Sequence, residues 1–437
     1  MTDVTMTEIW CAQAWLGGAG LSAEVLIEID NAGIVMAITP GVKPSAHAHR
    51  LTGWVLPGFV NNHSHAFHRG IRGRTHSGSA SFWEWREQMY ALATALTPET
   101  YAALARATYA EMVESGYTRV SEFHYLHHDR GGVSYADPNE MSHALAQAAV
   151  HSGIGLTLLD TLYLGSAPGV GAEGVQMRFS DGNVDRWIER NAAPLKHDSV
   201  CRGLAVHSVR AVTPTDIESA SFIAQQRNVP LHAHVSEQPR ENEECFAAYG
   251  RSPTQVFADA GALDADFTAV HATHLSSVDI QLLSSSHVCL CPTTEAELAD
   301  GIGPAGLLRD AGSGLSLGSD SQAIIDPFAE MQRIEWDQRL ATGRRGTFSG
   351  PDLARIGTRD GITVGSPADL VEIDPHSRRL AGASAESLSG LVFAASGADI
   401  KTVYVTGVEK VRDGRHVDID VTAELSAALA TVWGDLS

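Results

Sequence analysis

Short apolar segments alternate with longer segments of helical spacing between about residue 57 and residue 340. The segment 98–116, "PETYAALARATYAEMVESG", repeats alanine and leucine at helical spacing and ends on Gly116, which predicts a helix and its end. Eight short segments predict β-strands: 58–63, 118–125, 154–160, 201–208, 230–235, 267–273, 287–292 and 314–320. Eight strands that alternate with helices predict an α/β protein with a (β/α)8 TIM-like barrel over residues 57–360.

The two ends of the chain lack this alternation and carry strand and turn signals instead. Near the start, "AEVLIEID" and "AGIVMAITPG" are strand-like, and near the end "ADLVEID" is followed by "IKTVYVTGVEKVRDGRHV". Asp413 and Gly414 in the last of these segments predict a hairpin turn. We expect residues 1–56 and 361–437 to form one small β-sandwich domain beside the barrel.

The composition excludes several classes of protein. Hydrophobic residues make up 44% of the 437 residues, which suffices for a globular core and argues against disorder. A formal net charge of −21 argues against nucleic acid and anionic membranes as partners. Five scattered cysteines without a CxxC pair fit a reducing compartment, and the first residues show no signal peptide. We expect a soluble, cytoplasmic protein.

Polar side chains collect where the predicted strands end, and most of them are histidines. The carboxyl ends of the strands form the active-site face of this architecture, so we expect these side chains to meet at one mouth of the barrel. In chain order they are His63, His65, Tyr125, His207, His234, His271 and Asp320.

Four of these residues form a candidate metal site. His63 and His65 are two positions apart in an extended segment, so both imidazoles point to the same side and can reach one ion. With His234 and Asp320 they offer three nitrogens and one oxygen. This set suits one divalent metal ion with an open position for water, and Zn²⁺ is the expected ion. Glu237, three residues after His234, is placed to carry protons beside it.

In that order, "PGFVNNHSHAF", "HAHVSEQ", "VHATH" and "GSDS" resemble the amidohydrolase superfamily, in particular its mononuclear deaminase branch. The resemblance implies the barrel and the flanking β-sandwich described above. Binuclear members hold two metals with a carboxylated lysine near the fourth strand. Here Lys196 is the lysine nearest that strand, and it lies in the polar segment "APLKHDS". A single metal ion is therefore expected.

Further motifs resemble the formimidoylglutamate deiminase family: "SFWEWREQMY", "EFHYLHHD", "HSVRAV", "PTTEAELADGIGPA" and "GSDSQAIIDPFAE". Enzymes of this family convert N-formimidoyl-L-glutamate and water to N-formyl-L-glutamate and ammonia in one route of histidine degradation. The resemblance implies this reaction for the present chain, with a small dicarboxylate amidine as substrate. Relatives also suggest a homodimer.

Two arginines match the needs of such a substrate. Its two carboxylates call for forked, positively charged donors, and Arg86 and Arg210 occupy the matching positions. Ser81 and Glu84 have the spacing of a capping box, which predicts a helix start just before Arg86. The alternative for an arginine in a helical segment is a solvated helix face.

The resemblance assigns three further residues to the substrate pocket. Tyr125 and His207 would donate hydrogen bonds to the substrate, although each could equally be a buried core residue. His68 stands where some relatives carry glutamine and is expected to face the substrate. His232, two residues before His234, is predicted to belong to the core.

Some positions depart from the family pattern. Glu297 and Ala299 stand where the resemblance leads us to expect asparagine and glycine, and the segment 341–361 is shorter than usual. The shorter segment is expected to affect the closing helix of the barrel more than the metal site.

The resemblance also implies catalytic roles at the metal site. Asp320 would accept the proton of the attacking water, and His271 would orient that water. Glu237 would then protonate the leaving nitrogen.

Two other functions stay open at this point. A mononuclear deaminase of the same superfamily could act on an aminopyrimidine, guanine or a related ring, but its pocket would favour stacking and would not need two arginines. A non-catalytic metal-binding barrel would lack the catalytic groups, whereas Glu237, His271 and Asp320 are all present.

Overall fold

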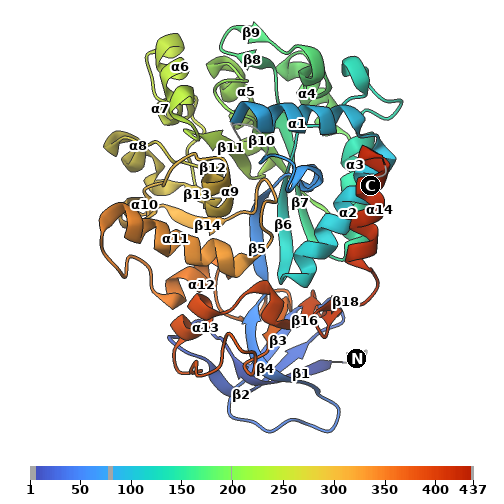
Figure 1. The fold of residues 1–437 in the computed structure, drawn as a ribbon, viewed down its shortest axis with the longest axis vertical. Coiled ribbons are helices and arrows are strands. Elements are labelled where there is room, and N and C mark those ends of the chain that lie inside the picture. Colours follow the sequence, from blue (N-terminus) through green and yellow to red (C-terminus); the bar gives the residue numbers. More distant parts are fainter. Residues whose placement is uncertain (1–5, 77–81, 198, 435–437) are drawn as a thin grey trace.

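Eight parallel strands form the middle of the molecule, and helices cover their outer side (Figure 1). We describe residues 6–76, 82–197 and 199–434 of a computed structural model. All eight strands predicted from the sequence are present. They are β5 (Phe59–Ser64), β6 (Tyr117–His124), β7 (Gly155–Leu162), β10 (Cys201–Val206), β11 (Leu231–Val235), β12 (Phe267–His271), β13 (His287–Leu290) and β14 (Gly314–Leu317).

The strands are neighbours in chain order, from β5 to β14. Most of their residues are buried, as expected for parallel strands that are covered on both sides. Backbone hydrogen bonds between the first strand and the segment after the last one close the barrel. The Asp320 N–H donates to the His63 oxygen at 3.0 Å, and the His65 N–H donates to the Asp320 oxygen at 3.1 Å. The predicted TIM-like barrel is therefore confirmed.

Helices follow the strands around the barrel. The helix predicted over 98–116 is α2 (Pro98–Glu114), which begins after the N-cap Thr97 and ends just before Gly116. The others are α1 (Phe82–Ala95), α3 (Glu140–Ser152), α4 (Val184–Ala192), α5 (Pro214–Arg227), α6 (Pro239–Tyr249), α7 (Pro253–Asp259), α8 (Ser277–Leu282), α9 (Pro292–Glu297), α10 (Ala305–Ala311), α11 (Pro327–Thr342), α12 (Gly350–Thr358), α13 (Leu388–Ala394) and α14 (Val421–Trp433). Ser81 of the predicted capping box lies outside the described residues.

Short elements lie between these helices and strands, mostly in the loops. Two of them, β8 (Gly165–Ala167) and β9 (Val170–Gly171), pair as a small hairpin after β7. The short 3-10 helices are η1 (Ala66–Ile71), η2 (Arg130–Gly132), η3 (Gly174–Arg178), η4 (Leu283–Ser285) and η5 (Gly397–Asp399).

A second sheet is built from both ends of the chain, as the sequence predicts. Its hydrogen-bonded order is continuous, β18-β17-β16-β15-β4-β1-β2-β3, so strands from the two termini meet where β15 pairs with β4. The predicted hairpin turn joins β17 to β18, with Asp413 and Gly414 at φ 51° and 73°. The strands are β1 (Thr7–Ala14), β2 (Ser22–Ile29), β3 (Val35–Thr39), β4 (His49–Pro57), β15 (Leu370–Ile373), β16 (Ile400–Val405), β17 (Val408–Arg412) and β18 (Arg415–His416).

The last helix leaves this sheet and packs on the barrel. Figure 1 shows α14 beside α2, and an ion pair between Arg106 and Glu424 joins the two helices. The Trp433 indole N–H donates to the Gly70 oxygen at 2.8 Å. Part of the C-terminal segment 361–437 thus lies on the barrel, while the domain boundaries at residues 56 and 360 stay predictions.

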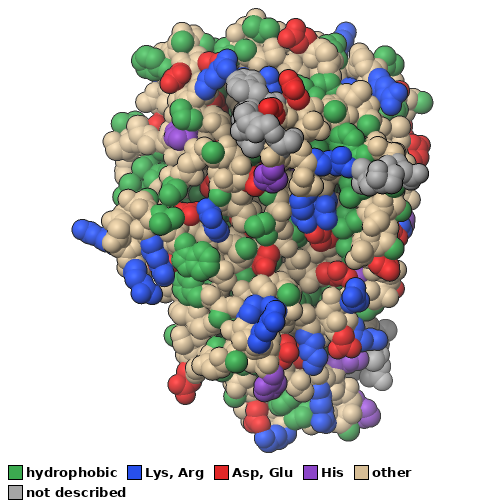
Figure 2. All heavy atoms as spheres, in the orientation of Figure 1, with side chains coloured by type: hydrophobic (Ala, Val, Ile, Leu, Met, Phe, Trp, Pro, Cys, Tyr) green, Lys and Arg blue, Asp and Glu red, His purple; other side chains and the backbone are tan. Residues whose placement is uncertain are grey.

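Charged side chains and the lengths of the helices can be examined for signs of a partner surface or a membrane span. Figure 2 shows acidic and basic side chains scattered among one another on the described part of one face. Within the described residues, no helix is long and apolar enough to cross a membrane. All five cysteines are free thiols.

Candidate active site

The four predicted metal ligands meet at the carboxyl ends of their strands. The Nε2 atoms of His63 and His65 lie 3.3 and 3.4 Å from Asp320 Oδ1, and His234 Nε2 lies 3.2 Å from His63 Nε2. All four side chains are buried. The ligand atoms of His63, His65 and Asp320 lie within 4.8 Å of one another, and His63 forms a second such group with His234 and His271. His63 thus joins two sets of atoms that could hold a divalent cation.

Hydrogen bonds at the Nδ1 atoms of two of these rings explain how the rings are oriented. His65 Nδ1 lies 2.9 Å from the Phe123 oxygen, and His234 Nδ1 lies 2.8 Å from the His207 oxygen. A carbonyl oxygen can only accept, so we assign the proton of each neutral ring to Nδ1. Both Nε2 atoms then present a lone pair to the centre of the cluster, the arrangement found in protein metal sites. The residues therefore fit a metal ion.

The backbone is strained where three strands deliver side chains to this site. Ser236 after β11, His271 at the end of β12 and Asp320 after β14 have φ angles of 53°, 67° and 41°. Residues with side chains rarely adopt this left-handed conformation, and such residues cluster at functional sites. Gly318 lets its backbone approach that of His63 closely, because a Cβ at this position would lie 2.7 Å from the His63 oxygen.

Two further titratable groups, His271 and Glu237, lie beside Asp320 of the cluster. His271 Nε2 lies 3.8 Å from both Glu237 Oε1 and Asp320 Oδ2. Burial raises the pKa of Glu237, and His271 offsets this only in part. Burial alone would also raise the pKa of Asp320, but the hydrogen bond from His63 and the charges of the histidines outweigh it and lower that pKa. Two neighbouring carboxylic acids thus have pKa values shifted in opposite directions, which is typical of acid–base sites.

A cavity of about 720 Å³ opens above this cluster. The five predicted substrate-binding residues all line it, as do the three predicted catalytic residues. The substrate-binding set is His68, Arg86, Tyr125, His207 and Arg210. The structure thus brings the predicted residues to one mouth of the barrel.

His68 and Tyr125 contact each other on one wall of this cavity. His68 Nε2 lies 3.0 Å from the Tyr125 hydroxyl, and the Trp85 ring packs edge-on against His68. Burial lowers the pKa of His68 to about 3. His68 is therefore neutral at neutral pH and can offer a hydrogen bond but no charge.

Arg86 and Arg210 reach the cavity from different elements. Arg86 lies on α1, which crosses above the carboxyl end of the barrel in Figure 1, and its guanidinium packs over the Tyr90 ring. Arg210 follows β10 and donates to the Ser166 oxygen at 3.1 Å. His207, at the end of the same strand, has a pKa lowered by burial and by the charge of Arg210.

Arg178, which sequence reasoning missed, holds α1 in place. Its side chain is 1% exposed and donates to the Ala93 oxygen, to the Leu96 oxygen at 2.9 Å and to the His128 oxygen at 2.8 Å. Ala93 is in the last turn of α1 and Leu96 follows that helix, so a buried positive charge sits at the negative end of its dipole. No sequence signal marked Arg178, because most of its acceptors are backbone atoms from distant segments.

Two carboxylates near the cluster were also missed. The Glu237 N–H donates to Glu241 at 3.0 Å, and burial together with the charge of Glu237 raises the pKa of Glu241 to about 7. Glu295 Oε1 lies 3.5 Å from His271 Nδ1 and accepts the Cys291 N–H at 2.8 Å. The i, i+4 spacing of Glu237 and Glu241 and the motif "PTTEAELADG" were signals that could have found them.

Other sequence expectations meet mixed outcomes. Lys196 is 59% exposed and pairs with Asp137, as expected of a solvated lysine. Ala299 has φ 59°, a conformation that glycine adopts more easily, so the expected glycine has a physical reason at this position. His232 is buried as predicted, but it lines a second cavity at the other end of the barrel.

Glu297, the other departure, forms a contact of its own at the edge of the mouth. Its carboxylate lies 2.9 Å from His76 Nε2. An asparagine at this position could not form the same ion pair with a protonated histidine.

Comparisons with known proteins show what the chain resembles. It matches the amidohydrolase family over residues 54–410. It is 36% identical to the formimidoylglutamate deiminase of Pseudomonas aeruginosa, over 99% of this chain and 100% of that protein. A 5-methylthioadenosine/S-adenosylhomocysteine deaminase of Syntrophobacter fumaroxidans is 27% identical over 84% of this chain and 82% of that one.

A solved structure agrees over nearly the whole chain. An amidohydrolase from Brucella melitensis has a TM-score of 0.89 and 33% sequence identity, and the match covers 98% of this chain and 99% of that one. The chain therefore belongs to the amidohydrolase family and, within it, to the formimidoylglutamate deiminase family.

Proposed function

We propose that this protein hydrolyses N-formimidoyl-L-glutamate to N-formyl-L-glutamate and ammonia. The observation that carries the proposal is that Arg86 and Arg210 line the same cavity as the histidine and carboxylate cluster. A dicarboxylate amidine needs two forked cationic donors at a fixed distance from a centre that activates water. The 36% identity to formimidoylglutamate deiminase over the whole chain supports the same substrate.

We propose Zn²⁺ as the metal, held by His63, His65, His234 and Asp320. Imidazole nitrogens with one carboxylate oxygen form a donor set that zinc prefers, although other divalent metals of the first transition series also accept it. A divalent cation at this site would supply Lewis acidity, which makes water a stronger acid near neutral pH.

The side chains beside the cluster would carry the protons of the reaction. Asp320 would accept a proton from the attacking water while the water oxygen bonds to the formimidoyl carbon. His271, whose Nε2 lies 3.8 Å from both carboxylates, would orient the water and stabilise charge on that oxygen. Glu237 would deliver a proton to the terminal nitrogen, which leaves as ammonia when its bond to carbon breaks.

The remaining lining residues would hold the substrate. Arg86 and Arg210 would bind the two glutamate carboxylates and so place the formimidoyl carbon beside the attacking water. Tyr125, His207 and the neutral His68 would add hydrogen bonds. Aromatic side chains in the same cavity could also stack on a ring, but a neutral ring offers no carboxylate for the two arginines to bind.

Ammonia release tests the proposal. Metal-analysed protein is given N-formimidoyl-L-glutamate and, in parallel, N-formimidoyl-L-aspartate, guanine and cytosine. We expect ammonia from the first compound with the highest kcat/KM, and loss of that activity when a chelator removes the metal. Release from a ring compound alone would overturn the substrate and leave the family assignment intact.

A further inference from the structure

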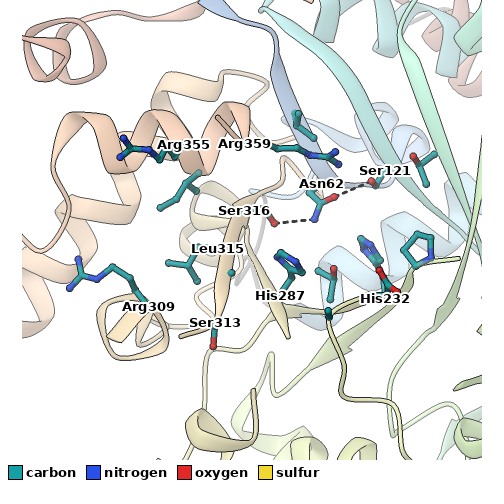
Figure 3. Close-up of a pocket in the computed structure, with 18 of the residues that line it drawn as sticks. Asn62, Ser121, His232, His287, Arg309, Ser313, Leu315, Ser316, Arg355 and Arg359 are labelled. Atoms are coloured by element: carbon teal, nitrogen blue, oxygen red, sulfur yellow. Dashed lines mark hydrogen bonds between the residues drawn. The ribbon is translucent and has the colours of Figure 1, made fainter. Parts of the chain in front are cut away.

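A second cavity, of about 640 Å³, opens at the amino ends of the barrel strands. Figure 3 shows that Asn62, His232, His287 and Arg359 surround one common space there. This is the opposite end of the barrel from the candidate active site. None of the roles proposed above involves it.

Several polar side chains lie among the apolar ones on the inner wall of this second cavity. Asn62 donates from its amide nitrogen to Ser316 at 3.0 Å, and its amide oxygen accepts from Ser121 at 3.1 Å (Figure 3). Thr268 also lines the cavity. Side chains inside such barrels are mostly branched and apolar, so this wall is suited to a polar occupant.

Arg359 stands at the rim in an unfavourable backbone conformation. It follows the last residue of α12, and its N–H donates to the Arg355 oxygen at 2.7 Å to end that helix. Its φ of 79° belongs to the left-handed region, where glycine or asparagine is the usual helix-ending residue. A side chain kept at such a position is a signal for function.

The guanidinium of Arg359 differs from the other two arginines of this cavity. Arg309 pairs with Asp310, and Arg355 donates to the Gly17 oxygen at 2.8 Å. Within the described residues, Arg359 has neither a hydrogen bond nor an ion pair through its side chain. Arg359 is exposed to solvent at the rim, where an anion can reach it.

Two acidic side chains line the same cavity, and neither pairs with Arg359. Asp352 lies 3.7 Å from Arg355 and accepts the hydroxyl of Ser349, which caps α12. Asp266 is exposed. Among the residues that the structure describes, the Arg359 cation at the rim therefore has no counter-charge of its own.

His232 supplies a buried donor on the opposite wall. It is 3% exposed, and its Nδ1 is buried without a hydrogen-bond partner among the described residues. A buried polar atom without a partner costs stability unless something else satisfies it.

We propose that this cavity binds a small oxyanion, a carboxylate or a phosphate, between the Arg359 guanidinium and the donors of Asn62 and His232. The guanidinium fork matches the paired oxygens of such an anion. The neutral donors behind it would satisfy the remaining oxygens. The proposal does not depend on the reaction at the other mouth.

Calorimetry tests the proposal. The metal-loaded enzyme is titrated with inorganic phosphate and, separately, with acetate at constant ionic strength, which distinguishes the two kinds of oxyanion. We expect one of them to bind with a stoichiometry near one, and Arg359→Met to weaken it by about tenfold or more, the loss typical of a charge-assisted hydrogen bond. Arg345→Met, at an exposed loop arginine, serves as the matched control and should leave binding unchanged.

A variant at the other mouth locates the bound anion. Arg210→Met should leave the affinity within about twofold of wild type. If the heat of anion binding disappears in Arg210→Met but persists in Arg359→Met, the anion binds at the active-site mouth and the proposal is overturned. Absence of binding by both anions up to tens of millimolar would overturn it as well.

Arg359→Gly separates binding from a structural role. Glycine accepts a positive φ, so this variant should unfold at the same or a higher temperature than wild type in anion-free buffer. It should also lose the stabilisation that the bound anion gives to wild type. A lower unfolding temperature in anion-free buffer would show that Arg359 serves the fold, and the proposal would fail.

Discussion

His232 and His234 are two residues apart on β11, yet they line cavities at opposite ends of the barrel. The cavities have similar volumes, about 720 Å³ around His234 and 640 Å³ around His232. Around His234, histidines and carboxylates lie within 4 Å of one another, on backbone strained at three strand ends. Around His232, Arg359 has no side-chain partner in the described part of the chain and faces hydrogen-bond donors.

This difference shows which features identify a reactive site. Cavity volume does not separate the two mouths, whereas the convergence of titratable groups with opposite pKa shifts does. The carboxyl mouth has paired acids and bases that can exchange protons. The amino mouth has a cation and hydrogen-bond donors without such a cluster, which fits binding of an anion rather than its conversion.

Glu237→Gln should have the largest effect on activity. A large loss would show that turnover occurs at the carboxyl mouth. The amide cannot deliver a proton, so kcat should fall by about 10²- to 10⁴-fold. Metal content should stay the same, because Glu237 is outside the ligand cluster. Ammonia release and elemental analysis measure both quantities. Glu243→Gln, at an exposed position of α6, the helix that follows Glu237, is the control. A near-wild-type rate for Glu237→Gln would refute the proton transfer.

Arg210→Met and Arg359→Met compare the same substitution at the two mouths. Loss of a charged hydrogen bond to a substrate carboxylate costs about 1.5–3 kcal/mol, so Arg210→Met should raise KM by roughly 10- to 100-fold with a smaller change in kcat. Arg359→Met should leave both constants within about twofold. Steady-state kinetics with N-formimidoyl-L-glutamate measures KM and kcat of both variants. Equal increases of KM in the two variants would contradict the different roles of the two mouths.

Arg178→Met should loosen the roof of the carboxyl mouth. The buried carbonyl oxygens of Ala93, Leu96 and His128 lose their donor, which should cost about 1–3 kcal/mol of stability. Because α1 carries Arg86, KM should also rise several-fold. Denaturant unfolding, kinetics and amide hydrogen exchange in α1 provide the measurements. Arg186→Met, at an exposed arginine of α4, is the control, and unchanged exchange in α1 would contradict the role of Arg178.

The smallest effect concerns pH and the two buried histidines with a pKa of about 3, His68 at one mouth and His232 at the other. Between about pH 3 and 6.5 such a ring binds a proton when unfolded but not when folded, so stability rises with pH over this range. Replacing either histidine by glutamine should reduce that slope by up to one proton in the metal-free protein.

Urea unfolding between pH 4 and pH 7 measures this slope. His47→Gln, at an exposed position, controls for the loss of an imidazole. The two buried variants should differ in activity, since only His68 faces the substrate cavity. Unchanged slopes in both would show that neither buried ring stays neutral in the folded protein.

Local sequence patterns predicted most of the barrel, because its strands depend on runs of buried residues that are visible in the sequence. The ligands His63, His65, His234 and Asp320 could be found for a related reason. Parallel strands deliver their carboxyl ends to one mouth, so positions far apart in sequence become neighbours by topology alone.

The features that the sequence did not reveal depend on tertiary contacts. Arg178 would be read as a surface residue from its type, and only the fold shows that backbone oxygens surround it. Glu295 lies in a motif that was recognised, but its distance from His271 depends on how α9 follows β13. Arg359 has an ordinary local sequence, and its function is suggested only by a φ angle and by the absence of a partner among the described residues.

The closure of the barrel has a kinetic consequence. Asn61 and Ser319, 258 residues apart in sequence, exchange hydrogen bonds of 2.7 and 3.0 Å where the first strand meets the end of the last. Contacts over such a separation are slow to form, because a long loop must be ordered first. His63 belongs to the first strand and Asp320 follows the last strand. A metal ion would therefore find both ligands in place only after these two parts of the barrel have met. Metal loading should therefore slow unfolding far more than it speeds folding, and the lifetime of the native barrel would depend on the supply of metal.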